Sequence, residues 1–353
     1  MSSSCYYPIL KTTVSEMRAL KQIDCSDGSS IHPIFELTKA RKSKYDEIGD
    51  VYKRVQEVKE IVKDNYFFLD LTSEDSLTNS QIDSFFDEFN DFENWRLFIN
   101  SLVGEGLAVR PVIQAYDDSS LEELAIQMNY FSELCGSFAI RIKPEYLDMD
   151  ISIKLIQASQ EFNFTTILDA EIVNDENLNY SVSIFTQFIQ QCKKDNLQFG
   201  DVIVCSSSFP SMVEHKNKDS GEFKIFEKDF YSRLLASDLG IDLKYGDYAS
   251  VHPFRNEVTA YNWVPRIDYP IDNLVIFCRK QRNSGGYKDC ANRMVVMPKY
   301  KVNPVTCWGA QEITDACTKP NGKSPSYWIS VRINIHMTRS VNWLKSYNPV
   351  TAK

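Results

Sequence analysis

The sequence YPILK at residues 7–11 is the first of eight short apolar runs that decide the fold. A charged or polar residue stands at or beside the end of each run, and most runs are separated by a stretch with helical periodicity. Strands that alternate with helices form parallel sheets, and eight such units in about 250 residues fit a closed barrel. We therefore predict a (β/α)8 TIM-type barrel over residues 1–252, with an appended C-terminal α+β segment over residues 253–353. The eight runs are residues 7–11 (YPILK), 31–37 (IHPIFEL), 66–71 (YFFLDL), 109–114 (VRPVIQ), 138–143 (FAIRIK), 165–171 (TTILDAE), 201–206 (DVIVCS) and 246–252 (GDYASVH).

Helices are predicted between the runs because apolar residues recur there at three- and four-residue intervals. Residues 46–65 place several valines on one helical face in this way. Ser120 and Glu123 have the spacing of a capping box at the start of another helix. Residues 72–108 are long enough for two helices, and the polar stretch at residues 211–224 is predicted to be a loop.

The segment at residues 253–353 differs from the barrel region in composition. It holds four of the five tryptophans and 15 basic against 6 acidic residues, whereas residues 1–252 hold 24 basic and 42 acidic residues. Two strands are predicted in residues 263–280, a loop leading into a helix in residues 284–297, and a further strand in residues 327–337. The opposed charges fit either a surface that faces nucleic acid or a segment docked on the acidic barrel. We favour docking, because tryptophans and apolar runs need a partner surface.

Composition also excludes several classes of protein. Nine cysteines are scattered without a CxxC pair, which is typical of reduced thiols in a cytoplasmic protein. No apolar stretch approaches the 18 or so residues of a transmembrane helix, and no secretory signal is visible. We therefore expect a cytoplasmic protein without a membrane partner.

Charged and polar side chains are expected at the carboxyl ends of the strands, where the active sites of barrels lie. Burying so many charges is costly unless they pair, bind a ligand or hold a metal. Glu36 and Asp70 have an alternative role as caps of helix N-termini. The candidates are Lys11, Glu36, Asp70, Asp169 and Glu171 for catalysis, and Arg141, Lys143, Ser206, Tyr248 and His252 for binding substrate or phosphate.

Two pairs of charged residues on neighbouring predicted strands give the sharpest local pattern. Arg141 and Lys143 are two residues apart, as are Asp169 and Glu171, so each pair shares a face of a regular strand. An acidic pair beside a basic pair suits a phosphorylated or carboxylated substrate, with Mg²⁺ or Mn²⁺ bound by Asp169 and Glu171. The same pattern is also expected of a salt-bridge layer that neutralises itself.

Other motifs favour less specific roles. Lys11 has the position of a Schiff-base lysine, but the glycines of a cofactor phosphate loop are missing after residue 206. Ser206 lacks the GxSxG elbow of a nucleophile, and the histidines and cysteines match no usual zinc spacing. The basic stretch at residues 279–286 ends in two glycines, so it is either a phosphate cradle or a solvated loop.

A series of short motifs resembles the family known as protein beta, found in phages, prophages and bacterial mobile regions. The motifs occur in order at residues 7–11 (YPILK), 16–20 (EMRAL), 33–37 (PIFEL), 207–210 (SSFP), 246–250 (GDYAS), 265–269 (PRIDY) and 328–336 (WISVRINIH). The family's Gly-Asp and paired histidines are replaced here by Gly309-Ala310 and Ile335-His336. The resemblance implies a setting in mobile DNA and phage–host conflict and assigns no role to a residue.

Two functions from different classes fit these observations. The first is a barrel enzyme, a hydrolase or lyase, that acts on a phosphate-bearing substrate such as a nucleotide or nucleic acid by acid–base or metal-assisted chemistry. The second is a non-catalytic binding or scaffold protein of a phage-defence or counter-defence system, with a protein partner from the same mobile locus. Convergence of the strand-end side chains on one solvent-reachable pocket favours the enzyme, and pointwise pairing of their charges favours the binding protein.

Overall fold

An eight-stranded parallel sheet curves into a nearly closed barrel in the computed structural model, which describes residues 5–23, 31–88, 91–147, 150–214, 218–254 and 263–346. The strand order is β4-β3-β2-β1-β9-β7-β6-β5. Beyond the two edge strands, Val112 forms a parallel bridge with Ala139, and the Ile113 N–H donates to the Ala139 carbonyl at 2.8 Å. The prediction of a (β/α)8 barrel is therefore confirmed. The strands are β1 (Tyr6–Lys11), β2 (Ile34–Leu37), β3 (Phe67–Leu71), β4 (Val109–Pro111), β5 (Phe138–Ile142), β6 (Phe164–Ile172), β7 (Asp201–Ser207) and β9 (Leu243–Asp247).

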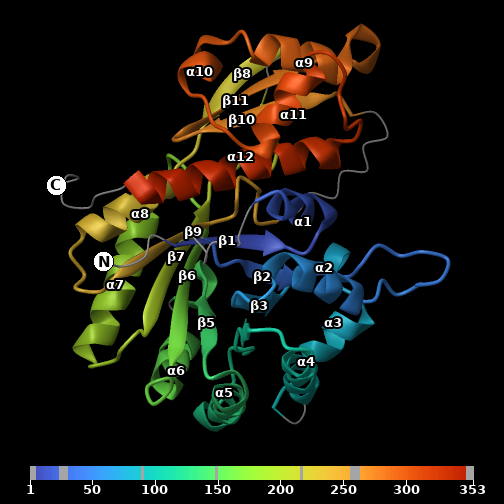
Figure 1. Cartoon of the computed structure of the whole chain (residues 1–353). Helices are drawn as coiled ribbons and strands as arrows, with labels where there is room; N and C mark the ends of the chain where they lie inside the picture. Colours follow the sequence, from blue (N-terminus) through green and yellow to red (C-terminus); the bar gives the residue numbers. More distant parts are fainter. Residues whose placement is uncertain are drawn as a thin grey trace.

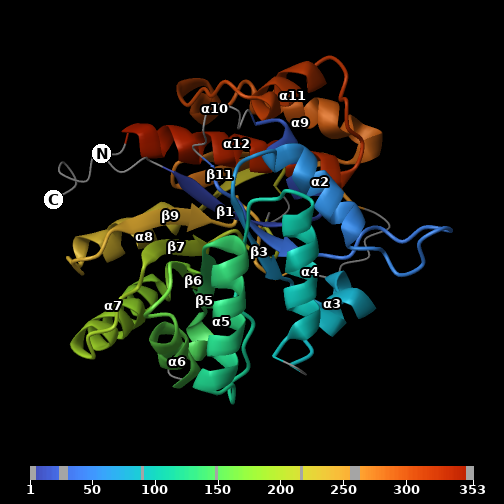
Figure 2. The same cartoon turned by 60° about the horizontal axis from the view of Figure 1, so that its bottom comes forward.

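Helices lie on the outside of this sheet (Figures 1 and 2). The crossover between β3 and β4 contains two α-helices, and the capping box of Ser120 and Glu123 starts α5, both as predicted. None of the helices in the described ranges is long and apolar enough to cross a membrane. The helices around the barrel are α1 (Val14–Lys21), α2 (Tyr52–Val62), α3 (Ser80–Phe85), α4 (Glu93–Gly104), α5 (Leu121–Cys135), α6 (Asp150–Ala158), α7 (Leu178–Lys194) and α8 (Glu227–Ala236).

Side chains alternate between two cores along each barrel strand, because successive residues of a strand point to opposite faces. In β1, Tyr7 and Ile9 pack in the barrel interior, whereas Tyr6 and Leu10 pack outside against the helices. Lys11 continues the interior series. The alternation thus directs a lysine into the mouth at the carboxyl end of the barrel.

The last barrel strand was predicted over residues 246–252. The observed strand, β9, spans Leu243–Asp247 and therefore ends earlier. Ala249 and Ser250 have left-handed φ angles of 48° and 59°, which stop the strand. Residue 246 of β9 has to be a glycine, because a Cβ atom at this position would lie 2.5 Å from the Tyr7 carbonyl oxygen. Tyr248 follows the strand and points into the interior core.

A second, three-stranded antiparallel sheet has the order β10-β11-β8. It combines β10 (Arg266–Ile271) and β11 (Leu274–Arg279), the two strands predicted around a turn, with β8 (Ser220–Lys224). The prediction of a loop over residues 211–224 is therefore wrong for residues 220–224, which form β8. β8 is polar because it is an edge strand with much of its surface in solvent. This sheet and the helices α9 (Gly286–Met294), α10 (Pro298–Val302) and α11 (Trp308–Ala316) are called here the C-terminal unit.

The long helix α12 (Pro325–Ser346) lies between the barrel and the C-terminal unit (Figure 1). The strand predicted over residues 327–337 is wrong. Val331 and Ile335 pack in the core of the C-terminal unit, whereas Ile333 and Met337 pack in the barrel's outer core. Residues two apart lie on nearly opposite sides of a helix. In a helix that is buried on two sides, apolar residues can therefore recur every second position, as they do in a strand.

Candidate functional site

Three neighbouring strands present charged side chains in one row at the barrel mouth. Lys11 of β1 is in register with Glu36 of β2, which is in register with Asp70 of β3. In-register residues of parallel strands point to the same face, so all three enter the interior. Their side chains are 8–10% exposed. The structure thus brings together the first three residues predicted for the site.

Arg141 of β5 connects this row to the opposite wall of the barrel. One guanidinium nitrogen, Nη1, lies 2.8 Å from Glu36 Oε1 and 2.7 Å from Asp70 Oδ2. Nε and Nη2 donate to Asp169 Oδ2 at 3.0 and 2.6 Å, and the Tyr248 hydroxyl donates to the same oxygen at 2.6 Å. A single buried cation therefore binds carboxylates from three strands. We call Lys11, Glu36, Asp70, Arg141, Asp169 and Tyr248 the interior network.

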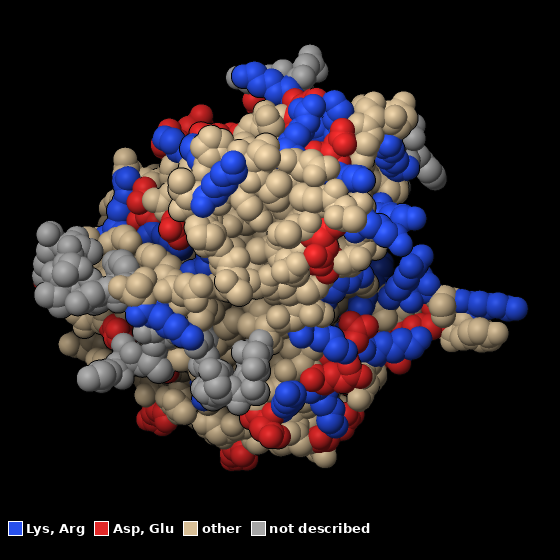
Figure 3. Space-filling model, turned by 45° about the horizontal axis from the view of Figure 1, so that its top comes forward, with Lys and Arg blue, Asp and Glu red and all other residues tan. Residues whose placement is uncertain are grey.

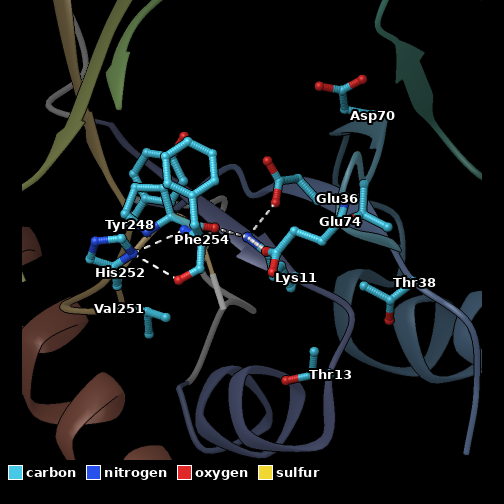
Figure 4. Close-up of polar contacts among 12 residues, drawn as sticks. Lys11, Thr13, Glu36, Thr38, Asp70, Glu74, Tyr248, Val251, His252 and Phe254 are labelled. Carbon is cyan, nitrogen blue, oxygen red and sulfur yellow. Dashed lines mark hydrogen bonds and ion pairs between the residues drawn. The ribbon is translucent and has the colours of Figure 1, made fainter. Parts of the chain in front are cut away.

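The charge of Lys11 is held by its neighbours (Figure 4). Its ammonium group lies 2.8 Å from Glu36 and 2.9 Å from Glu74, and it donates to the Pro253 carbonyl at 2.5 Å. Burial opposes the charge, but Glu36 and Glu74 outweigh it and raise the pKa of Lys11 above its usual value. For Glu36 burial is likewise outweighed, by Lys11 and Arg141, which lower its pKa to about 2. A lysine held charged in this way is unsuited to Schiff-base formation.

The remaining predicted residues lie outside the network. Lys143 and Glu171 face each other at 3.7 Å and are partly buried. Ser206 has the strand parity of Val202 and Val204, which pack in the outer core, so it points away from the interior. His252 is partly buried, and its Nδ1 accepts from the Phe254 N–H at 3.1 Å.

Asp169 and Glu171 do not form the metal pair predicted from a regular strand. The register of β6 shifts after Asp169, and Glu171 has a left-handed φ of 51°. Asp169 is already bound by Arg141 and Tyr248, and Glu171 lies near Lys143. Among the residues that the structure describes, no group of three or more His, Cys, Asp or Glu is placed to hold a metal ion. The donors present therefore do not fit Mg²⁺ or Mn²⁺ in this arrangement.

Glu16 is a buried carboxyl at the mouth that the strand-end argument missed. It stands in the first turn of α1, where it accepts from the Lys11 N–H at 3.0 Å and from the Thr13 hydroxyl. Burial raises the pKa of Glu16 to about 7, although Lys11 opposes the shift. A carboxyl with such a pKa exchanges protons near neutral pH. The T-x-x-E spacing of Thr13 and Glu16, typical of a helix N-terminus, was the available signal.

A pocket of about 320 Å³ opens beside this carboxyl, and we call it the mouth pocket. It is lined from the barrel by Lys11, Glu16 and His252, and from the C-terminal side by Arg266 and Arg332. Figure 4 shows the side chains of Lys11, His252 and Phe254 at this end of the barrel. The interior network therefore reaches a pocket through Lys11, while Arg141 stays buried behind it.

Arg266 and Arg332 share one carboxylate at the wall of the mouth pocket. Asp268 lies 2.8 Å from Arg266 Nε and 2.8 Å from Arg332 Nη1. Burial is outweighed by these two arginines, which lower the pKa of Asp268. Arg332 is 4% exposed and stacks on Phe209, and its Nε has no hydrogen-bond partner in the described part of the chain. Two cations and one anion leave a net positive charge at this wall.

Comparison with known proteins places this arrangement in a family. The model of the Beta protein family matches residues 6–342. The chain belongs to the Beta protein family. It is 26% identical over 344 residues to "Protein beta" of Enterobacteria phage P4, and the match covers 95% of this chain and 92% of the phage protein. The mouth pocket and the interior network both lie within the matched region of this family.

Proposed function

We propose that this member of the Beta protein family binds a phosphate-bearing substrate in the mouth pocket and acts on it by acid–base chemistry. The observation that carries the proposal is the pair of guanidinium groups at the pocket wall. Arg266 and Arg332 share a single carboxylate, so their side chains retain donors for a further anion. Arginine side chains bind phosphate through such paired N–H groups.

The anion is assigned to these arginines rather than to the basic residues of the barrel strands. Lys11 has three acceptors around its ammonium group, and Arg141 is surrounded by three carboxylates and a tyrosine. Lys143 faces Glu171 at 3.7 Å. Binding an anion at any of them requires breaking or competing with a buried ion pair, which is costly.

Proton transfer is assigned to Glu16. Its carboxyl lines the same pocket as the two arginines, and its pKa of about 7 allows it to donate or accept a proton at neutral pH. Lys11 and Glu36 remain charged as an ion pair, and both charges act on the carboxyl of Glu16. No metal enters this proposal, because Glu36, Asp70 and Asp169 are already paired with Lys11 or Arg141.

A small ligand is favoured over extended nucleic acid. Figure 3 shows a face whose middle is largely uncharged, with basic side chains gathered towards its margin and acidic side chains among them. Three basic residues of the C-terminal unit, one of them directly after β11, pair with acidic residues in or beside β8: Lys280 and Arg293 with Asp219, and Lys299 with Glu222. A continuous basic band, which is the footprint of nucleic-acid binding, is not visible on that face.

The second candidate is a non-catalytic binding protein, and one observation favours it. The charges of the interior network pair with one another, as a structural layer would. Similarity to a protein of phage P4 supports a setting in phage–host conflict for both candidates. In the second candidate the mouth pocket binds an anionic ligand without changing it, and the effect passes to a protein partner encoded beside it.

Ribose 5-phosphate is expected to bind the purified protein, and Arg266→Gln is expected to weaken the affinity by about 10- to 100-fold. The reason is that a hydrogen bond to a charged group contributes about 1.5–3 kcal/mol. Titration calorimetry at low salt measures both dissociation constants. Arg41→Gln, which removes an exposed arginine that does not line the mouth pocket, is the matched control and should leave the affinity unchanged.

Absence of binding, or equal loss in the Arg266 and Arg41 variants, contradicts the anion site. Incubation with a panel of sugar phosphates and nucleotides, followed by ³¹P NMR, then separates the two candidates. New phosphorus signals that Glu16→Gln abolishes without weakening ligand affinity support the enzyme. Tight binding with no new signal for any member of the panel favours the binding protein.

A further inference from the structure

A second cavity adjoins the mouth pocket on the side of the C-terminal unit. Its volume is about 280 Å³, and Arg266, Ile329 and Arg332 line both cavities. Four aromatic residues contribute to the remaining walls, Trp263, Phe277, Tyr287 and Trp328, together with Arg279 and smaller apolar side chains. We call it the aromatic pocket. The two cavities together fall within the range of small-molecule sites, roughly 300–1,000 Å³.

We infer that the aromatic pocket binds the base of a nucleotide whose phosphate lies at Arg266 and Arg332. The inference rests on the proposed function, and it specifies the substrate class as a nucleotide rather than another phosphate ester. Its basis is the adjacency of an aromatic surface to a cationic wall. A nucleotide carries both matching groups, a planar base and an anionic phosphate.

Tyr287 and Trp328 are buried in the pocket wall, with 7% and 3% of their surface exposed, and Trp263 is the most open of the three rings. Tyr287 and Trp328 stack on each other at a centroid distance of 4.9 Å, which fixes both rings in the wall. Trp263 is partly buried, and the Arg282 guanidinium lies 3.5 Å from the centroid of its ring. Bases stack on aromatic side chains of this kind, and adjacent arginines add a cation–π contribution.

The charge of the shared wall favours an anion over a neutral aromatic compound. Arg266, Arg279 and Arg332 line the aromatic pocket with Asp268 as the one acidic lining residue among those described. Arg332 is buried with one unpaired guanidinium nitrogen, Nε. A buried unpaired donor of a charged group is unfavourable, and a ligand oxygen removes that cost.

The test compares AMP with ribose 5-phosphate, which share the sugar phosphate and differ in the base. AMP is expected to bind at least about tenfold more tightly and to change the tryptophan fluorescence of the protein. Trp263→Leu should reduce the affinity for AMP to that for ribose 5-phosphate and leave the latter unchanged. Trp308→Leu, which removes a partly buried tryptophan outside the aromatic pocket, should preserve the preference for AMP.

The outcomes distinguish this inference from the proposed function. Equal affinities for AMP and ribose 5-phosphate overturn the base-binding pocket and leave the anion site standing. Tighter binding of AMP that survives Trp263→Leu also overturns it, because the base then lies elsewhere. If adenosine binds as tightly as AMP and loses affinity in the Trp263 variant, the aromatic pocket is supported and the anion site fails. If none of the three compounds binds, both fail.

Discussion

Arg141→Met is expected to lower the free energy of unfolding by about 4 kcal/mol at pH 7. The guanidinium is the buried partner of Glu36, Asp70 and Asp169, and removing one member of a buried ion pair typically costs about 3–5 kcal/mol. Methionine fills much of the volume, so the loss reports the uncompensated carboxylates rather than a cavity. Urea unfolding followed by circular dichroism measures the change.

Arg54→Met is the matched control for this prediction. Arg54 is as buried as Arg141, with a side chain 7% exposed, but its ion pair is with Glu57, whose side chain is 46% exposed. The same substitution there should cost about 1 kcal/mol or less, because a half-exposed carboxylate returns to water. Equal losses in the two variants would show that the interior network contributes nothing beyond side-chain packing.

The effect of Arg141→Met should shrink as the pH falls. In the native protein the pKa of Glu36 is lowered to about 2, below its ordinary value of 4.5. When folding lowers the pKa of a carboxyl, the ionised group stabilises the folded protein at pH values above the pKa that it has in the unfolded chain. This stabilisation is lost as the pH falls through the pKa of the folded protein. Arg141 provides part of this shift. The difference in the free energy of unfolding between the parent protein and Arg141→Met therefore becomes smaller from pH 7 towards pH 3.

Ile333→Asp is expected to prevent folding of the whole chain. Ile333 is fully buried on the side of α12 that packs in the barrel's outer core. Loss of the side chain and burial of a charge together cost about 5 kcal/mol or more, which is comparable with the total stability of many proteins. Soluble yield and the circular dichroism spectrum measure the outcome.

Two further variants of α12 define what this result means. Ile335→Asp, on the side that packs in the C-terminal unit, should be equally damaging, because α12 joins the two cores. Asn342→Asp, at an exposed position of the same helix, should be neutral within about 0.5 kcal/mol. A folded barrel in the Ile335 variant, with only the C-terminal unit lost, would contradict the role of α12 as a shared element.

The barrel was predictable because its strands combine buried apolar runs with regular spacing along the chain. Their positions at the carboxyl ends of the strands also predicted that Lys11, Glu36 and Asp70 lie together at the mouth. These inferences depend on local periodicity, which the sequence displays directly. The sequence does not reveal that a helix is buried on two sides. The alternating apolar residues of α12 were therefore interpreted as a strand.

The partners of the predicted site residues were not predictable from their positions. Arg141 binds carboxylates from three strands, and a sequence pattern does not reveal which charges meet across a barrel. The left-handed φ of Glu171 and the register shift after Asp169 break the regular alternation from which the acidic pair was predicted. Arg266 and Asp268 had the same two-residue spacing as the barrel pairs, but they lie in the second sheet, where a barrel argument does not look.

A crystal structure of the protein with AMP tests the central claim most directly, because it locates the phosphate. We predict phosphate oxygens within hydrogen-bond distance of the guanidinium groups of Arg266 and Arg332, and the base in the aromatic pocket beside Trp263. A phosphate bound instead by Arg141 inside the barrel, or by the basic stretch at residues 279–286, would contradict the assignment of the mouth pocket as the anion site.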